Sequence, residues 1–348
     1  MNKVFPLLAL SFMILPNHLY AYKYGLGSCL DQDLDQPIWS AIKEKNIDGF
    51  IFLGDNVYGD QHGSEEGKLE KAYEKQKSKI PLWLTEEKKI LAIWDDHDYG
   101  KNDGGGEYEY KKESKDLFLD FWQIPDNDPR RSREGIYFEE SQIIEGKIVQ
   151  IIGLDTRYFR SQLVSSKNGY QPNNDPLASL LGQEQWEWFE TVLENSKANI
   201  IVILSSIQIL ATNHPYEKWA NFTLDRNKLL AEIKNASTDK KIIAISGDRH
   251  RAGLYQQGDF IEITASALNK GASQIGIKTK PLIQASNSRY VIENNPAFFY
   301  IETDPLLLGV TYPEINFGIL NIEPSKNKIT LSINDKDGNE LESKVINL

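Results

Sequence analysis

Three apolar segments of this chain each end in a cluster of acidic residues, and this repeated pattern constrains the fold more than any other feature. The three clusters are Asp95-Asp96-His97-Asp98 after residues 90–94, Gly54-Asp55-Asn56 after residues 49–53, and Gly247-Asp248-Arg249-His250 after residues 241–246. Short apolar runs that stop at polar residues are typical of buried strands. Open α/β sheets place ligands at the carboxyl ends of such strands. The pattern therefore predicts an α/β protein with a site at one edge of its sheets.

Clustered carboxylates repel one another and are difficult to stabilise at neutral pH without a cation. A fourth strand tip has the same design, because residues 24–27 lead into Ser28 and Cys29, the only cysteine of the chain. A lone cysteine is usually a small buried residue, but its place at a strand tip favours a metal ligand. A polar turn with solvated charges would explain any one of these tips. A metal-centred active site explains all four.

The first residues have the features of an export signal. Lys3 precedes an apolar stretch over residues 4–15, and Leu19-Tyr20-Ala21 fits a cleavage site. We expect residues 1–21 to be a signal peptide and residues 22–348 to form a single domain that is periplasmic or secreted. The alternative is an N-terminal anchor that is retained. No later stretch is apolar enough to span a membrane.

The formal net charge of −11 argues against a nucleic-acid surface. It also means that an anionic substrate needs local help from cations or arginines. We expect a monomer.

Strands and helices alternate through the first half of the chain, which is typical of a parallel sheet with helices outside. The predicted strands are residues 24–27, 49–53, 90–94, 135–139, 147–154, 200–205, 241–246, 260–265, 317–322 and 328–333, and the predicted helices lie near residues 37–45, 68–79, 114–122, 183–195 and 225–234. Two sheets packed face to face, each with outer helices, accommodate all of these elements.

Taken in order, the strand-tip motifs resemble the alkaline phosphatase D family of the metallophosphoesterase superfamily. The residues that carry the resemblance are Gly27-Ser28-Cys29, Gly54-Asp55-Asn56-Val57-Tyr58, Trp94-Asp95-Asp96-His97-Asp98, Leu154-Asp155-Thr156-Arg157, Ser205-Ser206-Ile207-Gln208, His214, Glu217, Trp219, Gly247-Asp248-Arg249-His250 and Asn316-Phe317-Gly318. The resemblance covers nearly all of residues 22–348. It implies an αββα sandwich and a dinuclear metal centre whose metal-bound hydroxide hydrolyses phosphate esters.

The departures from the wider superfamily concern the metals. Where relatives have Asp-x-His, this chain has Ser28-Cys29, and where they have Gly-His-x-His it has Gly247-Asp248-Arg249-His250. The alkaline phosphatase D branch carries the same replacements and is associated with iron and calcium. A phenol such as that of Tyr58 ligates at neutral pH only if a strongly acidic ion such as Fe³⁺ removes its proton. The remaining carboxylates suit Ca²⁺ or another divalent ion.

The resemblance implies a role for each candidate residue. Asp55 bridges the two metals, Cys29 and Tyr58 bind Fe³⁺ with Asp248 or His250, and Asp96 binds the second ion, for which Asn102 is a further candidate ligand. His97 protonates the leaving alkoxide or steadies the phosphoryl group. Arg157 is the expected phosphate clamp. The alternative for Asp155 is that it only caps or pairs with Arg157.

Two further predictions concern contact with the substrate. Arg249 is expected to be a salt-bridge partner rather than a substrate contact. Residues 103–106 and 160–176 are the expected rim of the site. Three classes of substrate are compatible with the resemblance: phosphate monoesters, phosphate diesters and phospholipids. The competing hypothesis is a non-catalytic protein that binds calcium or another ligand on the same scaffold.

Overall fold

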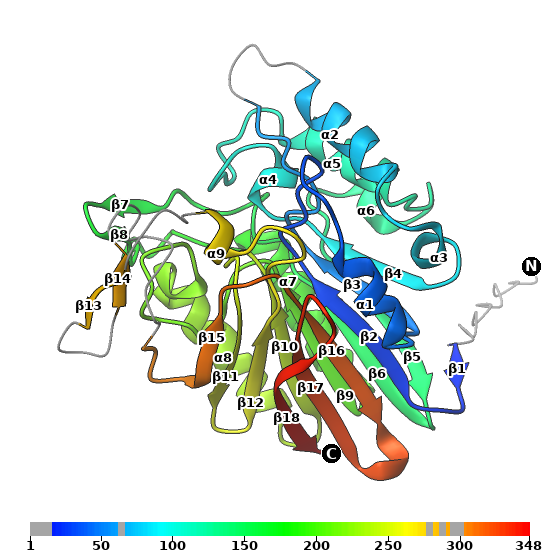
Figure 1. Ribbon diagram of the computed structural model, residues 1–348. Coiled ribbons are helices and arrows are strands. Elements are labelled where there is room, and N and C mark those ends of the chain that lie inside the picture. Colours follow the sequence, from blue (N-terminus) through cyan, green and yellow to red (C-terminus); the bar gives the residue numbers. More distant parts are fainter. Residues whose placement is uncertain (1–15, 62–66, 276–280, 285–289, 293–302) are drawn as a thin grey trace, which may run out of the picture.

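The computed structural model describes residues 16–61, 67–275, 281–284, 290–292 and 303–348, and two mixed β-sheets form its centre (Figure 1). The larger sheet has the order β1 (Asn17–His18), β5 (Phe138–Ile144), β6 (Lys147–Gly153), β9 (Ile200–Ser205), β10 (Lys241–Ser246), β12 (Phe260–Thr264), β11 (Ala252–Gln257) and β15 (Leu307–Tyr312). The smaller has the order β18 (Glu340–Asn347), β17 (Lys328–Asp335), β16 (Asn316–Glu323), β2 (Tyr22–Gly27), β3 (Gly49–Leu53) and β4 (Lys89–Ile93).

Two small hairpins and a set of helices surround the sheets. The hairpins pair β7 (Val164–Ser166) with β8 (Gly169–Gln171) and β13 (Pro281–Gln284) with β14 (Tyr290–Ile292). The α-helices are α1 (Ile38–Glu44), α2 (Lys68–Lys77), α3 (Leu82–Thr85), α4 (Asp96–Tyr99), α5 (Lys111–Phe121), α6 (Pro129–Ser132), α7 (Gly182–Asn195), α8 (Thr223–Ala236) and α9 (Ala272–Ile275), and the 3₁₀ turns are η1 (Trp219–Asn221) and η2 (Pro324–Lys326).

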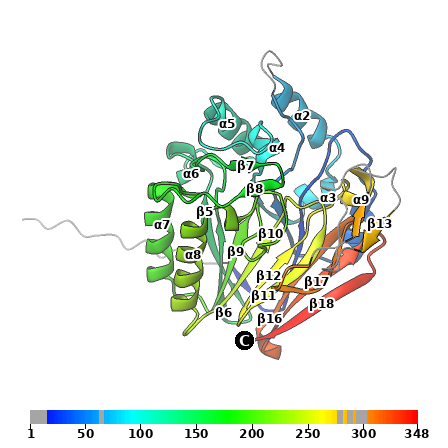
Figure 2. The same ribbon diagram turned by 90° about the vertical axis from the view of Figure 1, so that its left-hand side faces the viewer.

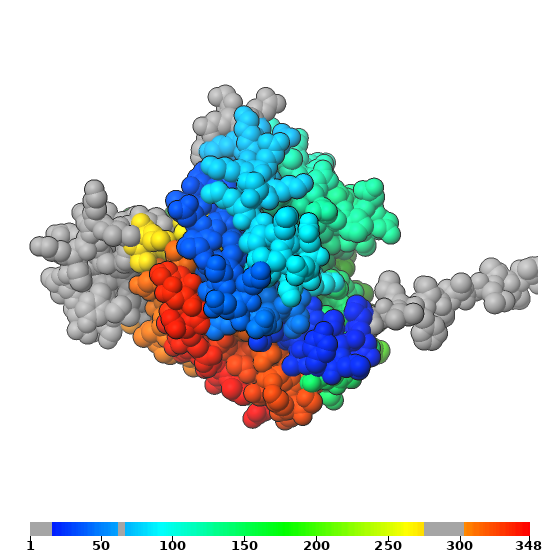
Figure 3. Space-filling model, turned by 45° about the vertical axis from the view of Figure 1, so that its right-hand side comes forward, coloured from blue at the N-terminus to red at the C-terminus, as the bar shows by residue number. Residues whose placement is uncertain are grey.

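Each sheet contains a group of parallel strands, which lies in the middle of the larger sheet and at one side of the smaller sheet. β2, β3 and β4 run parallel in the smaller sheet, and β6, β9, β10 and β12 run parallel in the larger one. Strands that run parallel all end at the same edge, so the loops that follow them meet there. The chain's last strands join this arrangement through β16, which pairs antiparallel with β2. Segments from both ends of the chain therefore share one face of the molecule (Figure 3).

The alternation of side chains along β9 shows why two sheets and outer helices pack together. Ile201 and Ile203 belong to the core between the larger sheet and helices α7 and α8, whereas Val202 and Leu204 belong to the core shared by the two sheets. Neighbouring residues of a strand point to opposite faces, so a strand that is apolar throughout must be covered on both sides. Figure 2 shows α7 and α8 on the outer face of the larger sheet, with β16–β18 on the opposite side of the molecule.

The predicted αββα sandwich is confirmed, and each predicted helix is present near its expected position. The strand predicted over residues 135–139 is placed wrongly, because β5 begins at Phe138. Gly135 has a φ of 73°, and the backbone N–H of Ile136 donates to Asp155 Oδ2 at 2.9 Å. These residues form a turn fixed to Asp155 instead of a strand.

The predicted leader lies mostly outside the described residues, because the description begins at residue 16. β1 falls within the segment 1–21 and pairs in parallel with β5. Among the described residues, no helix combines the length and the apolar character that a membrane span requires.

Candidate metal centre

The loops after four parallel strands converge on one cavity of about 300 Å³. Asp55 and Tyr58 follow β3, Asp96 and His97 follow β4, and Asp248 and His250 follow β10; all six line this cavity. Cys29, which follows β2, lies beneath it and is completely buried. The sequence-predicted metal ligands, which come from both sheets, are therefore brought to one place.

The backbone at this edge is held in a conformation that non-glycine residues rarely adopt. Cys29, Asp55, Asp248 and His250 have φ values of 56°, 50°, 67° and 52°. Such residues persist only where the surrounding structure over-determines them, and they cluster at functional sites. Gly54, with a φ of 97°, is required for a second reason, because a Cβ there would lie 2.4 Å from the Cβ of Asp95.

The carboxylate of Asp98 fixes the two strand tips of the smaller sheet to each other. It accepts hydrogen bonds from the backbone N–H groups of Asp95 at 2.6 Å, Asp55 at 3.2 Å and Asn56 at 3.3 Å. The side-chain amide of Asn56 also donates to it. Asp98 is fully buried, so these four donors replace the water that an exposed carboxylate would have. Asp98 is thus a structural residue that sets the position of Asp55.

Asp55 is the centre of the first group of possible ligands. Its Oδ2 atom lies 3.5 Å from Cys29 Sγ and accepts a hydrogen bond from the Tyr58 hydroxyl at 3.0 Å. Ligand atoms of Cys29, Asp55 and His250 all lie within 4.8 Å of one another. His250 Nδ1 is 2.6 Å from the carbonyl oxygen of Lys270, which fixes the proton on Nδ1 and leaves Nε2 as a ligand atom. Burial lowers the pKa of His250 to about 3, so the imidazole is neutral, as metal binding requires.

Asp96 is the centre of two further groups. It lies with Asp55 and His97 in one group and with Asp103 and Glu217 in another. Asp96 Oδ2 accepts from the backbone N–H of Asp103 at 2.7 Å, while Oδ1 is buried with no hydrogen-bond partner among the described residues. Asn102, the possible additional ligand, also lines the cavity. Asp248 does so as well but belongs to none of the three groups, so His250 is the better placed of the two candidates beside Cys29.

These residues fit a cationic cofactor. Burial and the charges of Cys29 and Asp96 raise the pKa of Asp55 well above its usual range, and burial with the charge of Asp95 does the same for Asp248. Ionised forms of these groups therefore need positive charge nearby. A thiol, a phenol, an imidazole and several carboxylates together offer ligands for both a transition metal and a hard ion.

His97 lies at the cavity wall next to Asp60, which the sequence motifs did not indicate as a site residue. Its Nδ1 atom is 2.5 Å from Asp60 Oδ2, and its ring packs on that of Tyr58 with centroids 4.2 Å apart. Burial alone lowers the pKa of His97, but the charges of Asp96 and Asp60 outweigh it and raise the pKa to about 9. His97 is therefore protonated at neutral pH in this arrangement, as a general acid must be.

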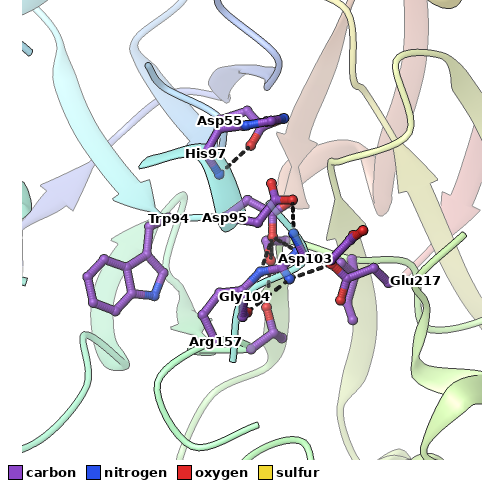
Figure 4. Close-up of polar contacts among 12 residues, drawn as sticks. Asp55, Trp94, Asp95, His97, Asp103, Gly104, Arg157 and Glu217 are labelled. Atoms are coloured by element: carbon purple, nitrogen blue, oxygen red, sulfur yellow. Dashed lines mark hydrogen bonds and ion pairs between the residues drawn. The ribbon is translucent and has the colours of Figure 1, made fainter. Parts of the chain in front are cut away.

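Arg157 is not placed where the predicted phosphate clamp would have to be. It is completely buried and does not line the cavity. Its Nε atom donates to Asp95 Oδ1 at 2.7 Å, Nη2 binds the same oxygen, and Nη1 pairs with Glu217 (Figure 4). The guanidinium thus neutralises two buried carboxylates beneath the site. The alternative considered for Asp155 holds in part, since Asp155 caps backbone N–H groups of Arg157 and Tyr158.

The sequence patterns did not indicate two further residues of the site, Asp60 and Lys270, whereas Asp103 lies in the predicted rim and Glu217 is among the residues that carry the family resemblance. Asp60 lies in the loop that follows Asp55, but the spacing does not indicate which acidic residue meets His97. Glu217 belongs to no strand tip. The rim predicted at residues 160–176 includes Tyr170, whose hydroxyl donates to Asp103 Oδ2 at 2.6 Å.

Two face-to-face sheets with this ligand cluster at their strand ends define a protein of the metallophosphoesterase class. The model of the PhoD-like phosphatase family matches residues 83–306, which is well over half of the 348 residues. The chain therefore belongs to the PhoD-like phosphatase family, a family of phosphoesterases. The matched segment contains Asp96, His97, Arg157, Asp248 and His250.

Solved structures agree on the fold. A structure of PhoD is similar with a TM-score of 0.65 and 15% identity, covering 95% of this chain and 73% of that one. GAP50, described as the anchor in the inner membrane complex of Plasmodium, is similar with a TM-score of 0.57 and 12% identity, covering 94% of this chain and 89% of that one. No curated protein matches the chain.

The placement of Arg157 generates a test of its structural role. We expect Arg157→Met to lower the free energy of unfolding by about 3–5 kcal/mol, because it leaves Asp95 and Glu217 buried without their counter-charge. Lys75→Met, which removes an exposed pair with Asp33, should cost at most about 1 kcal/mol. Urea denaturation measures both. If the Arg157→Met protein is as stable as the wild type but no longer binds phosphate, the result would support the prediction that Arg157 is the phosphate clamp.

Proposed function

We propose that this protein is an exported, metal-dependent phosphatase or phosphodiesterase with a dinuclear centre. The observation that carries the proposal is that Asp55 belongs to two groups of possible ligands, one with Cys29 and His250 and one with Asp96 and His97, and that it also binds the Tyr58 hydroxyl. Family membership supports hydrolysis of phosphate esters. Export rests on the predicted leader alone.

The residues divide into two sets around Asp55. Cys29, Tyr58 and His250 would hold Fe³⁺, Asp96 with Asn102 would hold Ca²⁺ or another divalent ion, and Asp55 would be shared, while Asp248 lines the same cavity. When bound, such ions supply Lewis-acid chemistry, polarising phosphoryl oxygens and activating water. The shared role of Asp55 agrees with its central position among Cys29, Tyr58, Asp96 and His97.

The chain's own acid–base chemistry is assigned to His97. Its Nδ1 atom is held by Asp60, so its Nε2 proton is the one available to a leaving group. The ring is also fixed against Tyr58, which limits its rotation. In hydrolysis, His97 would give this proton to the departing alkoxide as the ester P–O bond breaks and would take a proton back from solvent.

The central test of the proposed function uses Asp55→Asn. We expect hydrolysis of phosphate esters to fall by more than about 100-fold and metal content to drop, because the amide lacks the charge that two ions would share. Asparagine adopts the left-handed backbone of this position, so the fold should persist. Asp33→Asn, which changes an exposed carboxylate, is the control. Elemental analysis and activity measured together decide the result. Full metal and activity in Asp55→Asn would rule out the dinuclear centre.

The identity of the first metal is tested at Tyr58. If Tyr58 binds Fe³⁺ as a phenolate, the purified protein is coloured, and Tyr58→Phe removes the visible absorbance while the ring still packs on His97. Cys29→Ser should weaken iron binding as well, since a hydroxyl is a poor replacement for a thiolate. Iron per chain and visible spectra check both variants. Unchanged iron in the two variants would assign the site to another metal.

The role of His97 is tested by the leaving group. We expect His97→Ala to lower turnover of alkyl phosphates by about 10²- to 10⁴-fold, the range of general acid catalysis. The loss should be much smaller for nitrophenyl phosphates, whose leaving group needs no proton. Steady-state rates on the two substrate types separate this role from a structural one. Equal losses would remove His97 from the acid role, and a stable, inactive wild-type protein would favour the non-catalytic alternative.

A further inference from the structure

Besides His97, two cationic side chains line the cavity within the described part of the chain, Arg249 and Lys270. Lys270 is held against the wall, because its ammonium group lies 2.9 Å from Asp31 Oδ2 and 3.3 Å from the centre of the Tyr58 ring. Arg249 packs its guanidinium group over the ring of Tyr216, 4.6 Å from the ring centre. Stacking of this kind fixes the plane of the guanidinium and directs its N–H groups along that plane.

The backbone places Arg249 within reach of the ligand cluster. It lies between Asp248 and His250, which both have left-handed backbone conformations. Its own N–H donates to the carbonyl of Gly247 at 2.9 Å, and the N–H of His250 donates to Ser266 Oγ at 2.9 Å. The start of the Arg249 side chain is therefore as firmly positioned as His250 itself.

A cation at the cavity wall offsets the carboxylates that line it. Asp55, Asp96, Asp103 and Asp248 line the cavity, together with Glu217, which pairs with Arg157, in a chain whose net charge is −11. Carboxylates repel an anionic substrate. Arg157 cannot offset them toward the substrate, because Asp95 and Glu217 surround its guanidinium beneath the cavity.

We propose that Arg249 binds the non-bridging oxygens of the substrate's phosphoryl group and that Tyr216 is the positioning residue that orients it. This assignment rests on the proposed function for the nature of the substrate. It gives Arg249 the role that was predicted for Arg157, in addition to the salt bridge expected of Arg249. A guanidinium suits this task because two of its parallel N–H groups match two phosphoryl oxygens.

Arg251 provides a matched control. It lies two residues further along, is equally buried, and donates through Nη1 to Thr311 Oγ1 at 3.1 Å, but it does not line the cavity. Arg249→Gln and Arg249→Lys are therefore compared with Arg251→Gln and Arg251→Lys. The probe is inorganic phosphate, whose Kd is measured by calorimetry on protein as purified, with the metal content and melting temperature of each variant recorded.

We expect Arg249→Gln to raise the Kd of phosphate about 10- to 100-fold, the usual effect of losing a charge-assisted pair, with metal content unchanged. Arg249→Lys should fall between it and the wild type, since it keeps the charge but loses the paired geometry. For an ester substrate KM should rise more than kcat falls. Tyr216→Leu should weaken phosphate binding several-fold, and Tyr216→Phe, which keeps the ring, should not. The Arg251 variants should bind phosphate as the wild type does.

Three results would overturn the assignment: unchanged phosphate affinity in Arg249→Gln, an equal loss in Arg251→Gln, or a loss that follows the loss of metal. If Arg249→Gln does not fold, Arg249→Lys decides in the same way. The proposed function fails separately. If the wild-type protein hydrolyses no ester but binds phosphate through Arg249, the proposed enzymatic function is wrong and the role of Arg249 in phosphate binding stands. If the wild-type protein is active and Arg249→Gln binds phosphate with unchanged affinity, the enzymatic function stands and the role of Arg249 is wrong.

Discussion

Crowding of buried carboxylates at one edge of the sheets is the constraint on which the rest of this structure depends. Asp55, Asp95, Asp96 and Asp98 lie within two adjacent strand tips and are almost completely shielded from water. A buried charge is stable only when it is paired or hydrogen-bonded. Arg157 balances Asp95, and backbone N–H groups surround Asp98. Asp96 lies beside His97, and the pKa of Asp55 is raised by its burial and by the charges of Cys29 and Asp96, so these two carboxylates are the residues around which metals are proposed.

The same contacts that shape the centre also join the two sheets. Asp95 follows β4 of the smaller sheet, while Arg157 and Ser206 follow β6 and β9 of the larger one, and both donate to Asp95 Oδ1. Glu217 binds the other side of Arg157. Because these hydrogen bonds are fully buried, water cannot replace a partner that is removed, and the remaining polar group is left unpaired. Stability and the geometry of the site are therefore coupled in this protein, and losses of activity near Asp95 have to be read beside unfolding data.

The sequence allows the fold and part of the site to be predicted, and the structure shows why the prediction stops where it does. Asp55 and Cys29 could be paired because adjacent parallel strands end at one edge, and period-two apolar runs identify such strands. His250 comes from the other sheet, so its place beside them required the family resemblance. The roles of Asp60 and Glu217 could not be predicted. Their contacts with His97 and Arg157 depend on the conformation of loops, and loops have no periodic pattern in the sequence. The pairing of Arg157 with Glu217 could not be predicted for the same reason, since the two residues are 60 positions apart in the sequence.

The two arginines near the centre illustrate how burial decides function for one residue type. Arg157 and Arg249 both follow strand ends of the larger sheet, and the sequence favoured Arg157 for phosphate binding. A guanidinium enclosed by two carboxylates has its charge satisfied and its N–H groups used, so it supports the protein. Arg249 is stacked on the ring of Tyr216 at the cavity wall, where its guanidinium adds positive charge to the lining. In a protein of net charge −11, an anion reaches the centre only where such a cation outweighs the nearest carboxylates. The position of Arg249 beside His250 places that cation next to a proposed metal ligand, so the proposed substrate contact and the proposed metal site share one strand tip.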